Sequence, residues 1–105
     1  AYDKALSAGE NSNIYITDLN LMNNKVGIAV KDGSKVTLKN LNLFNNEYDV
    51  AIYNKKNEFS VPDLKIYNFN ANNKKILQSK KSNLSINDIK IIGEYTNAYI
   101  NSQIY

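Results

Sequence analysis

Carboxylates are the residues of this chain whose types and spacing best suit chemistry. Glu10 and Asp32 lie 22 residues apart, and Glu47 and Asp49 form a second, local pair. Two carboxylates about 5–10 Å apart serve as acid and base, or as nucleophile, in glycoside hydrolysis. Carboxylate oxygens are also the ligands that calcium prefers. The fold must decide which of these pairs come together.

Composition excludes most other catalytic and metal chemistry. The 105 residues include no Cys and no His. Thiolate nucleophiles, Ser-His triads and His- or Cys-ligated zinc therefore cannot form within this chain. All 13 basic residues are Lys and the net charge is only +3. Specific nucleic-acid binding normally recruits Arg for bidentate contacts, so we expect no nucleic-acid partner.

An aromatic and cationic stretch is the second candidate site. The segment 53–62, "YNKKNEFSVP", carries Tyr53, Lys55, Lys56 and Phe59. On a surface loop, aromatic rings stack on sugar rings and ammonium groups bind hydroxyls or carboxylates. We predict ligand binding, with glycan as the ligand, by these four residues. The alternative is a loop that folds back so that Phe59 plugs the side of the domain.

An internal repeat specifies what positions these residues. Segments that start at Asn13, Lys35, Asp63 and Asn83 align as "NIYITDLNLMNN", "KVTLKNLNLFNN", "DLKIYNFNANNK" and "NLSINDIKIIGE". In each, apolar and polar residues alternate, the phase slips by one residue, and the alternation resumes. Period two indicates a strand with one buried face, and the slip indicates a bend. With a further apolar stretch, each unit of 20–28 residues has three short strands.

Asn and Asp recur where the units bend. These residues tolerate the left-handed backbone conformation and bond their own backbone, so they suit a corner repeated in every unit. The first corner column consists of Asp18, Asn40, Asn68 and Asp88. The second consists of Asn23, Asn45, Asn73 and Gly93.

Bent units of this length predict an all-β fold, a right-handed parallel β-helix (solenoid) of about four rungs in one domain, 1–105. Successive rungs are expected at 13–34, 35–62, 63–82 and 83–105. An antiparallel sandwich is the alternative, but it needs hairpin signals and only Asp32-Gly33 provides one. A leucine-rich repeat is a third choice.

Residues 1–12 align with the last third of a rung, because Leu6 falls beside Ile28 and Ala8 beside Val30. We therefore expect the chain to be a fragment of a longer coil. At the other end, Tyr95, Tyr99 and Tyr105 are expected to shield the last rung from solvent. No apolar run is long enough for a membrane span.

The repeat alignment places Glu10 one rung from Asp32, which makes this pair the candidate metal site for weakly bound calcium. No other cofactor is expected. Asp18 and Asp88 share a column but lie three rungs apart, about 14 Å at the usual strand spacing, so they cannot cooperate. Glu47 and Asp49 are expected to form a solvated bend. No catalytic residue is predicted.

The repeats resemble the β-helices of the pectin-lyase-like superfamily across nearly the whole chain. More narrowly, "KALSAGENSNIYI", "GIAVKDGSKVTLKNLNL" and "YDVAIYNKKNEF", within residues 4–59, are similar to β-helical segments of spore-coat-H-like bacterial surface proteins. The resemblance implies a secreted or cell-surface bacterial protein. It supplies no catalytic residues, and the absence of Arg departs from the lyases of the superfamily.

Two functions follow as expectations. The first is a non-catalytic structural or assembly section with weak glycan binding, whose partners are a polysaccharide or another protein subunit at the open rung ends. The alternative is the C-terminal remainder of a polysaccharide-degrading enzyme or phage tailspike. The enzyme question stays open, and the missing His, Cys and Arg favour a negative answer.

Overall fold

The computed structural model describes residues 4–104 as nine strands and one helix. The elements are β1 (Lys4–Ala8), β2 (Asn13–Met22), β3 (Val26–Lys31), β4 (Lys35–Phe44), β5 (Tyr48–Tyr53), β6 (Asp63–Ala71), β7 (Ile76–Gln78), β8 (Asn83–Ile86), β9 (Ile89–Ile91) and α1 (Asn97–Ile104). They form two sheets, with the strand orders β1-β3-β5-β7 and β2-β4-β6-β8-β9.

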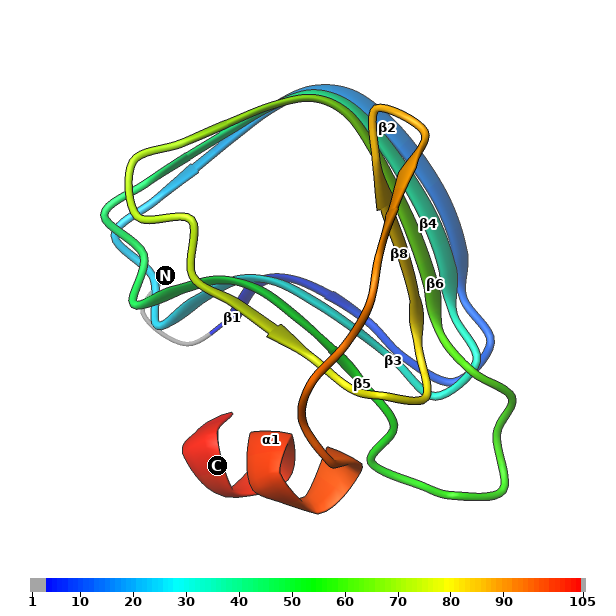
Figure 1. Cartoon of the computed structure of the whole chain (residues 1–105). Coiled ribbons are helices and arrows are strands. Elements are labelled where there is room, and N and C mark those ends of the chain that lie inside the picture. Colours follow the sequence, from blue (N-terminus) through cyan, green and yellow to red (C-terminus); the bar gives the residue numbers. More distant parts are fainter. Residues whose placement is uncertain (1–3, 105) are drawn as a thin grey trace.

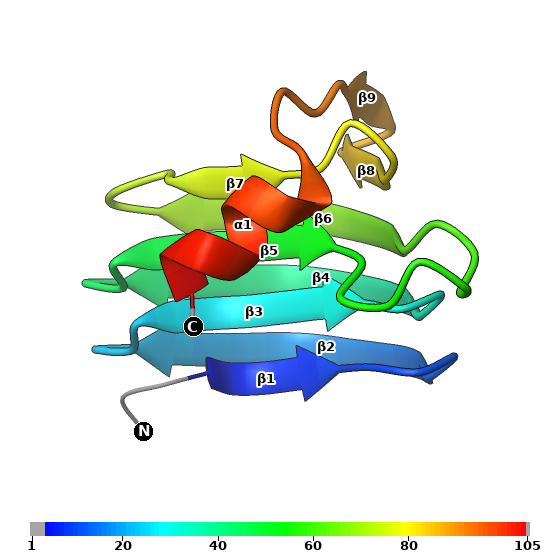
Figure 2. The same ribbon diagram turned by 90° about the horizontal axis from the view of Figure 1, so that it is seen from below.

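From β1 to β8, consecutive strands alternate between the two sheets, so the chain coils. Neighbouring strands in each sheet are parallel, apart from the antiparallel pair β8 and β9. Figure 1 looks along the coil, with the two sheets facing each other, and Figure 2 shows the turns stacked on one another. The fold is a β-solenoid of about four turns, which confirms the predicted fold class.

The register of the sheets follows the repeat alignment. Asn13 pairs with Lys35, Lys35 with Asp63, and Asp63 with Asn83. The partial turn at the start is also confirmed, because β1 pairs with β3 and Leu6 lies opposite Ile28. Like residues of successive turns are therefore direct neighbours across the parallel ladder.

The Asx corners adopt the left-handed conformation that the sequence predicts. The φ angles are 59°, 56°, 59° and 65° at the first-corner residues Asp18, Asn40, Asn68 and Asp88. These bends do not interrupt the hydrogen-bonded strands, so β2, β4 and β6 each run through the corner as one long strand where two had been expected. At the second corner Asn23 and Asn45 are left-handed, but in the third turn Lys74 takes this conformation in place of Asn73.

Amide side chains bond from turn to turn along the corners. Asn40 Nδ2 donates to Asp18 Oδ1 at 2.9 Å, and Asn68 Nδ2 donates to Asn40 Oδ1 at 2.8 Å. A parallel ladder beside it links Asn42 to Asn20 at 2.9 Å. In each of these bonds the later turn donates to the earlier one. The ladders satisfy the polar groups of the exposed corners and hold the turns in register.

The interior is a set of aliphatic columns between the two sheets. Leu38, Leu41 and Leu43 of β4 have no exposed surface, like most of their neighbours in β3, β5 and β6. In the first turn, Ile16 and Leu19 occupy the same columns but are only half-buried, because no turn covers them among the described residues. Stability thus comes from contact with a neighbouring turn on both sides.

The rung expected at 83–105 is not a complete turn in its described part, 83–104. β8 continues the coil, and β9 then turns back antiparallel to it. The chain next crosses to the outer face of the other sheet, where α1 packs (Figure 1). Ile100 and Ile104 of α1 are buried there against Ala29, Ala51 and their neighbours.

Tyr95 lies against the last turn, because it pairs with Ser79 directly after β7 and packs against the core cluster that contains Leu77, whereas Tyr99 lies on α1. The rings of Tyr95 and Tyr99 stack with their centroids 5.0 Å apart. Tyr105 lies outside the described residues. The helix has eight residues, and no helix among residues 4–104 has the length and apolar character to span a membrane.

One buried carboxylate interrupts the apolar interior. Asp49 was expected in a solvated bend with Glu47, but its side chain has no exposed surface, whereas Glu47 is exposed. Its Oδ2 accepts the N–H of Lys75 at 3.2 Å, and its Oδ1 has no partner. Burial raises the pKa of Asp49. The preceding turn has Gly27 at this place, where a Cβ would lie 2.8 Å from the Asp49 carbonyl oxygen.

Truncating a column residue tests the stacked core. We expect Leu41→Ala to lower the free energy of unfolding by about 2–5 kcal/mol, because it opens a cavity with a turn on either side. Leu19→Ala, in the same column at the open end, should lower it by clearly less because Leu19 is half-buried. Urea unfolding followed by circular dichroism measures both. Equal losses would contradict the burial gradient along the coil.

Replacing the buried carboxylate tests its effect on stability. Because the folded-state pKa of Asp49 is raised, its contribution to stability is largest below the unfolded-state pKa and is lost as pH rises through the folded-state value. Asp49→Asn should therefore stabilise the protein by about 1 kcal/mol at pH 7, and the gain should shrink toward pH 4. Thermal unfolding across this pH range measures the difference. The matched control Glu47→Gln should show no such trend.

Candidate functional site

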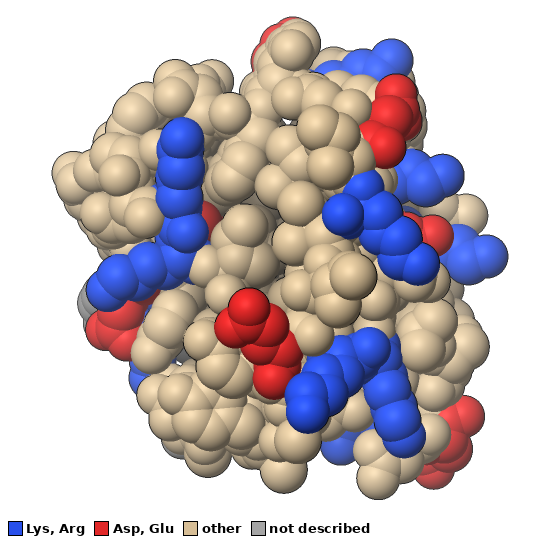
Figure 3. Space-filling model, viewed as in Figure 1, with Lys and Arg blue, Asp and Glu red and all other residues tan. Residues whose placement is uncertain are grey.

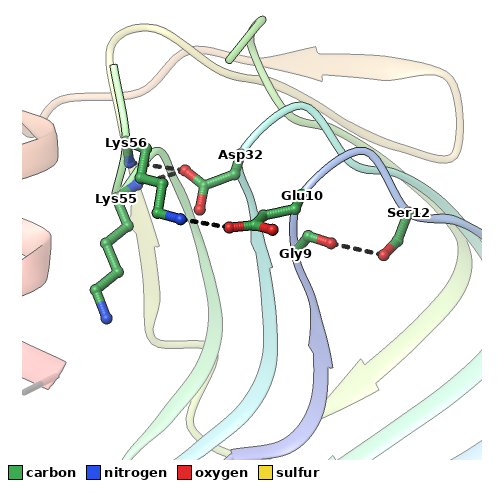
Figure 4. Close-up of polar contacts among 6 residues, drawn as sticks. All are labelled: Gly9, Glu10, Ser12, Asp32, Lys55 and Lys56. Carbon is green, nitrogen blue, oxygen red and sulfur yellow. Dashed lines mark hydrogen bonds and ion pairs between the residues drawn. The ribbon is translucent and has the colours of Figure 1, made fainter. Parts of the chain in front are cut away.

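The predicted pair of carboxylates lies in a charged corner beside the long loop. We define the charged corner as Glu10, Lys31, Asp32, Lys55 and Lys56, which line a shallow depression of about 350 Å³. They come from the ends of β1, β3 and β5, which are neighbours in one sheet. Figure 4 shows Glu10 and Asp32 on adjacent turns, with Lys56 reaching across to both. The sequence thus predicted correctly that Glu10 and Asp32 come together.

Asp32 serves the backbone of the loop. Its side chain is buried, with 2% of its surface exposed, and its Oδ1 accepts the N–H groups of Lys55 and Lys56, each at 2.8 Å. The N–H of Asp32 itself donates to Asn54 Oδ1 at 2.7 Å. A carboxylate held by two backbone donors is a structural anchor. It fixes the point where the chain leaves β5 for the loop.

Asn54 fastens the other side of this loop, residues 54–62. Its Nδ2 donates to the carbonyl oxygens of Phe59 at 3.1 Å and Ser60 at 3.0 Å. Its backbone N–H donates to Asn97 Oδ1 at 2.9 Å, which links the loop to the start of α1. The longest excursion from the coil is therefore a braced loop.

Glu10 pairs with a cation in the charged corner. Its Oε1 accepts from Lys56 Nζ, and both side chains are more than half exposed. This hydrogen bond holds the pKa of Glu10 below its ordinary value and the pKa of Lys56 above its own. A solvent-screened pair of this kind contributes little to stability. It does, however, give Glu10 a partner.

Calcium binding by Glu10 and Asp32 stays a prediction. Among the described residues, no group of three or more acidic side chains is placed to bind one metal ion. Both carboxylates also have donors of their own, an ammonium group for Glu10 and backbone N–H groups for Asp32. A calcium ion would have to displace Lys56 before reaching the pair.

The four predicted ligand-binding residues do not form one surface. Tyr53 has no exposed surface, because it packs in the core cluster beneath α1, so it has no surface to offer a ligand. Lys55 and Lys56 are exposed on the loop, and Phe59 is half-buried. β5 is buried from Asp49 to Tyr53 because both faces of this strand are covered.

A different surface gathers aromatic and cationic groups. The outer face of β2, β4 and β6 carries what we call the tyrosine-lysine face: Tyr15, Thr37, Lys39, Lys65 and Tyr67. These side chains, with Asn68 and Asn87, line an open depression of about 640 Å³. Alternation in the strands turns all five outward, on a sheet whose inner face is the core.

The tyrosine-lysine face is ordered by contacts between turns. Lys39 Nζ lies 5.6 Å from the centroid of the Tyr15 ring, and 60% of Tyr15 is exposed. A hydrogen bond to the Tyr15 phenol raises the pKa of Lys39. The Tyr67 hydroxyl donates to Asp88 Oδ1 at 3.0 Å, which raises the pKa of Tyr67. The face therefore presents the Lys39 ammonium group between the rings of Tyr15 and Tyr67.

Reasoning from the sequence placed no site here, although the signal was present in the alignment. Alternation puts Tyr15 and Tyr67 on the outer face. The register pairs Thr17 with Lys39 and Lys39 with Tyr67, so Lys39 lies between the two rings. Neighbours on a sheet face include such diagonal pairs, which a search for vertical columns does not find.

On the face drawn in Figure 3 the charged residues do not form a field of one sign. Figure 3 shows acidic and basic side chains interspersed around the end of the coil seen in Figure 1. The corner carboxylates of Asp18 and Asp88 are acceptors for Asn40 and Tyr67. Asp18 and Asp88 thus already accept hydrogen bonds between turns of the coil.

Comparison with known proteins identifies no relative: no protein-family model matches the chain, and no curated protein or solved structure matches it. The fold is established by the structure, whereas the resemblance to pectin-lyase-like and spore-coat-H-like proteins rests on the sequence pattern.

Removing the loop anchor tests the role of Asp32. We expect Asp32→Ala to speed tryptic cleavage after Lys55 about tenfold, because the N–H groups of Lys55 and Lys56 lose their acceptor and the loop opens more often. Glu10→Gln is the matched control, since it removes only the exposed ion pair and should leave the cleavage rate unchanged. Equal effects of the two substitutions would contradict the assignment of Asp32 as anchor.

Proposed function

We propose that this chain is a non-catalytic β-solenoid section of a secreted or surface-attached bacterial protein, and that its tyrosine-lysine face binds glycan weakly. The observation that carries this proposal is the exposed ring of Tyr15, held beside Lys39 on a rigid sheet. An aromatic face covers the apolar side of a sugar ring, and a neighbouring cation binds its hydroxyl or carboxylate groups.

The supporting sheet favours binding without rearrangement. Tyr15, Thr37 and Lys65 are direct neighbours across β2, β4 and β6, and their backbones are fixed by parallel pairing. A preformed surface loses little conformational freedom when a ligand binds. The shallow, open shape of the depression limits the contact area, so affinity should be weak. The two lysines favour a glycan that carries carboxylate groups.

The carboxylates support the non-catalytic part of this proposal, because they already have structural roles. Asp32 holds the loop backbone, Asp49 is buried, and Asp88 accepts from Tyr67. A glycosidase needs two carboxylates that both face the substrate. The residues that line the tyrosine-lysine depression provide phenols, ammonium groups, amides and the Thr37 hydroxyl.

The family relation is part of the proposal. A β-solenoid of short parallel turns with Asx corners supports kinship with the pectin-lyase-like superfamily, and with spore-coat-H-like surface proteins in particular. The secreted or cell-surface location follows from that kinship. The loop residues Lys55, Lys56 and Phe59 stay a second predicted contact surface for glycan.

Binding to an array of neutral and uronic-acid oligosaccharides tests the proposed surface. Tyr15→Ala and Lys39→Ala should each reduce retention about tenfold or more, since each removes one half of the aromatic and cationic contact. Tyr99→Ala is the matched control, because Tyr99 is an exposed tyrosine on α1, away from this face. Its retention should equal that of the parent protein.

The double variant Lys55→Ala, Phe59→Ala separates the two surfaces. Retention should be unchanged in this variant if the tyrosine-lysine face is the site. Loss of retention in the loop variant alone would move the site to the loop. No retention of the parent protein on any glycan would refute the binding proposal.

A further inference from the structure

The last turn of the coil has a polar residue in a core column. This residue is Gln78 of β7, and its counterparts in the earlier turns are Ala8, Val30 and Ile52. All three are buried, and Gln78 is buried as well, with 4% of its surface exposed. A buried amide costs free energy unless its polar atoms are hydrogen-bonded. The partners of this side chain therefore need an explanation.

The side-chain amide of Gln78 is satisfied on one side only. Its Nε2 donates to the carbonyl oxygen of Ile91 at 2.8 Å. This bond fixes the orientation of the amide, because a carbonyl oxygen can bond to the NH₂ group and not to Oε1. The buried Oε1 has no hydrogen-bond partner among the described residues. A buried acceptor of this kind is satisfied when another molecule supplies a donor.

Gln78 lines a cavity between β7 and the chain that follows β9. The volume of this cavity is about 210 Å³. Its lining consists of Ile76, Gln78, Ile91, Ile92, Glu94 and Tyr95. Ile92 is 82% exposed and Glu94 is exposed, so these two residues mark the mouth, whereas Gln78 lies on the inner side. Because an apolar cavity of about 150 Å³ can hold benzene, this one has room for a ring with a short substituent.

The chain that covers the cavity, residues 92–96, is held against β7 by its backbone. It runs from β9 across the last turn to α1 (Figure 1). The N–H of Tyr95 donates to the carbonyl oxygen of Gln78 at 3.2 Å. A Cβ at Gly93 would lie 2.0 Å from the carbonyl oxygen of Ser79, so only glycine allows this close approach. The cavity wall is therefore formed before a ligand arrives, which lowers the entropic cost of binding.

The chemistry of the lining favours a cation. Among the described residues, the lining has one carboxylate, Glu94, and no lysine. Three isoleucines and the ring of Tyr95 form its apolar part. An ammonium group donates up to three hydrogen bonds and accepts none, so it matches both the Gln78 Oε1 and the Glu94 carboxylate. An anionic ligand would be repelled by the same two groups.

We propose that this cavity binds a small primary amine that has an apolar body and is protonated. The ammonium group donates to Gln78 Oε1 and lies beside the Glu94 carboxylate. The apolar body packs against Ile76, Ile91 and the ring of Tyr95. This site belongs to β7 and the chain after β9, whereas the tyrosine-lysine face belongs to β2, β4 and β6. The inference therefore goes beyond the proposed function, and each can fail without the other.

Titration with benzylamine tests the site, because this amine combines one ring with one ammonium group. In ¹H–¹⁵N NMR spectra the side-chain NH₂ signals of Gln78 and the backbone N–H of Tyr95 should shift saturably, with a Kd of about 1 mM. Benzyl alcohol keeps the ring and lacks the charge, so it should bind about tenfold more weakly. Phenylacetate should leave these signals unchanged. No saturable shift up to about 20 mM benzylamine, or shifts confined to the tyrosine-lysine face, would overturn the proposal.

Two substitutions locate the ammonium group. Gln78→Leu removes the acceptor and makes the column apolar, as in the earlier turns, so benzylamine affinity should fall about tenfold or more. Glu94→Gln removes the charge at the exposed mouth, so it should weaken benzylamine about threefold and leave benzyl alcohol unaffected. Glu58→Gln is the matched control, because Glu58 is an exposed acid on the loop after β5 and outside the cavity lining. Circular dichroism checks that each variant folds. Unchanged benzylamine affinity in Gln78→Leu or in Glu94→Gln would contradict the proposal.

Discussion

The parallel ladder between successive turns is the interaction on which the rest of this structure depends. A single turn of 20–28 residues encloses almost no apolar surface, so its aliphatic side chains become core only when a turn lies on either side. Leu41 is fully buried for this reason, while Leu19, one turn earlier in the same column, is not. Register is therefore the central constraint, because a slip of one residue would exchange the inner and outer faces of a whole strand.

The corners maintain that register. Left-handed Asp18, Asn40 and Asn68 shift the side-chain phase at the same place in each turn, which keeps both halves of a long strand facing inward. Their side chains then bond one turn to the next. Asp49 is an exception to this pattern, because the preceding turn has Gly27 beside it and offers no side chain to bond with. One oxygen of the buried Asp49 carboxylate has no hydrogen-bond partner.

Repetition explains what the sequence predicts well and what it does not. The coil, its register, the first corner column and the approach of Glu10 to Asp32 all follow from the alignment. The helix α1 does not, because it occurs once and its sequence, "NAYINSQI", shows little amphipathic pattern. The sequence did indicate that something covers this sheet, because β3 and β5 contain continuous apolar runs, which are typical of strands covered on both faces. The same cover explains why Tyr53 belongs to the core while Lys55, two residues later, is exposed.

The helix α1 covers the outer face of one sheet and so determines which sheet a partner molecule can contact. With α1 on the outer face of β3 and β5, the outer face of β2, β4 and β6 is left as the broad exposed side of the coil. A partner that binds the side of the coil therefore meets β2, β4 and β6, where the outward side chains of three turns lie in register.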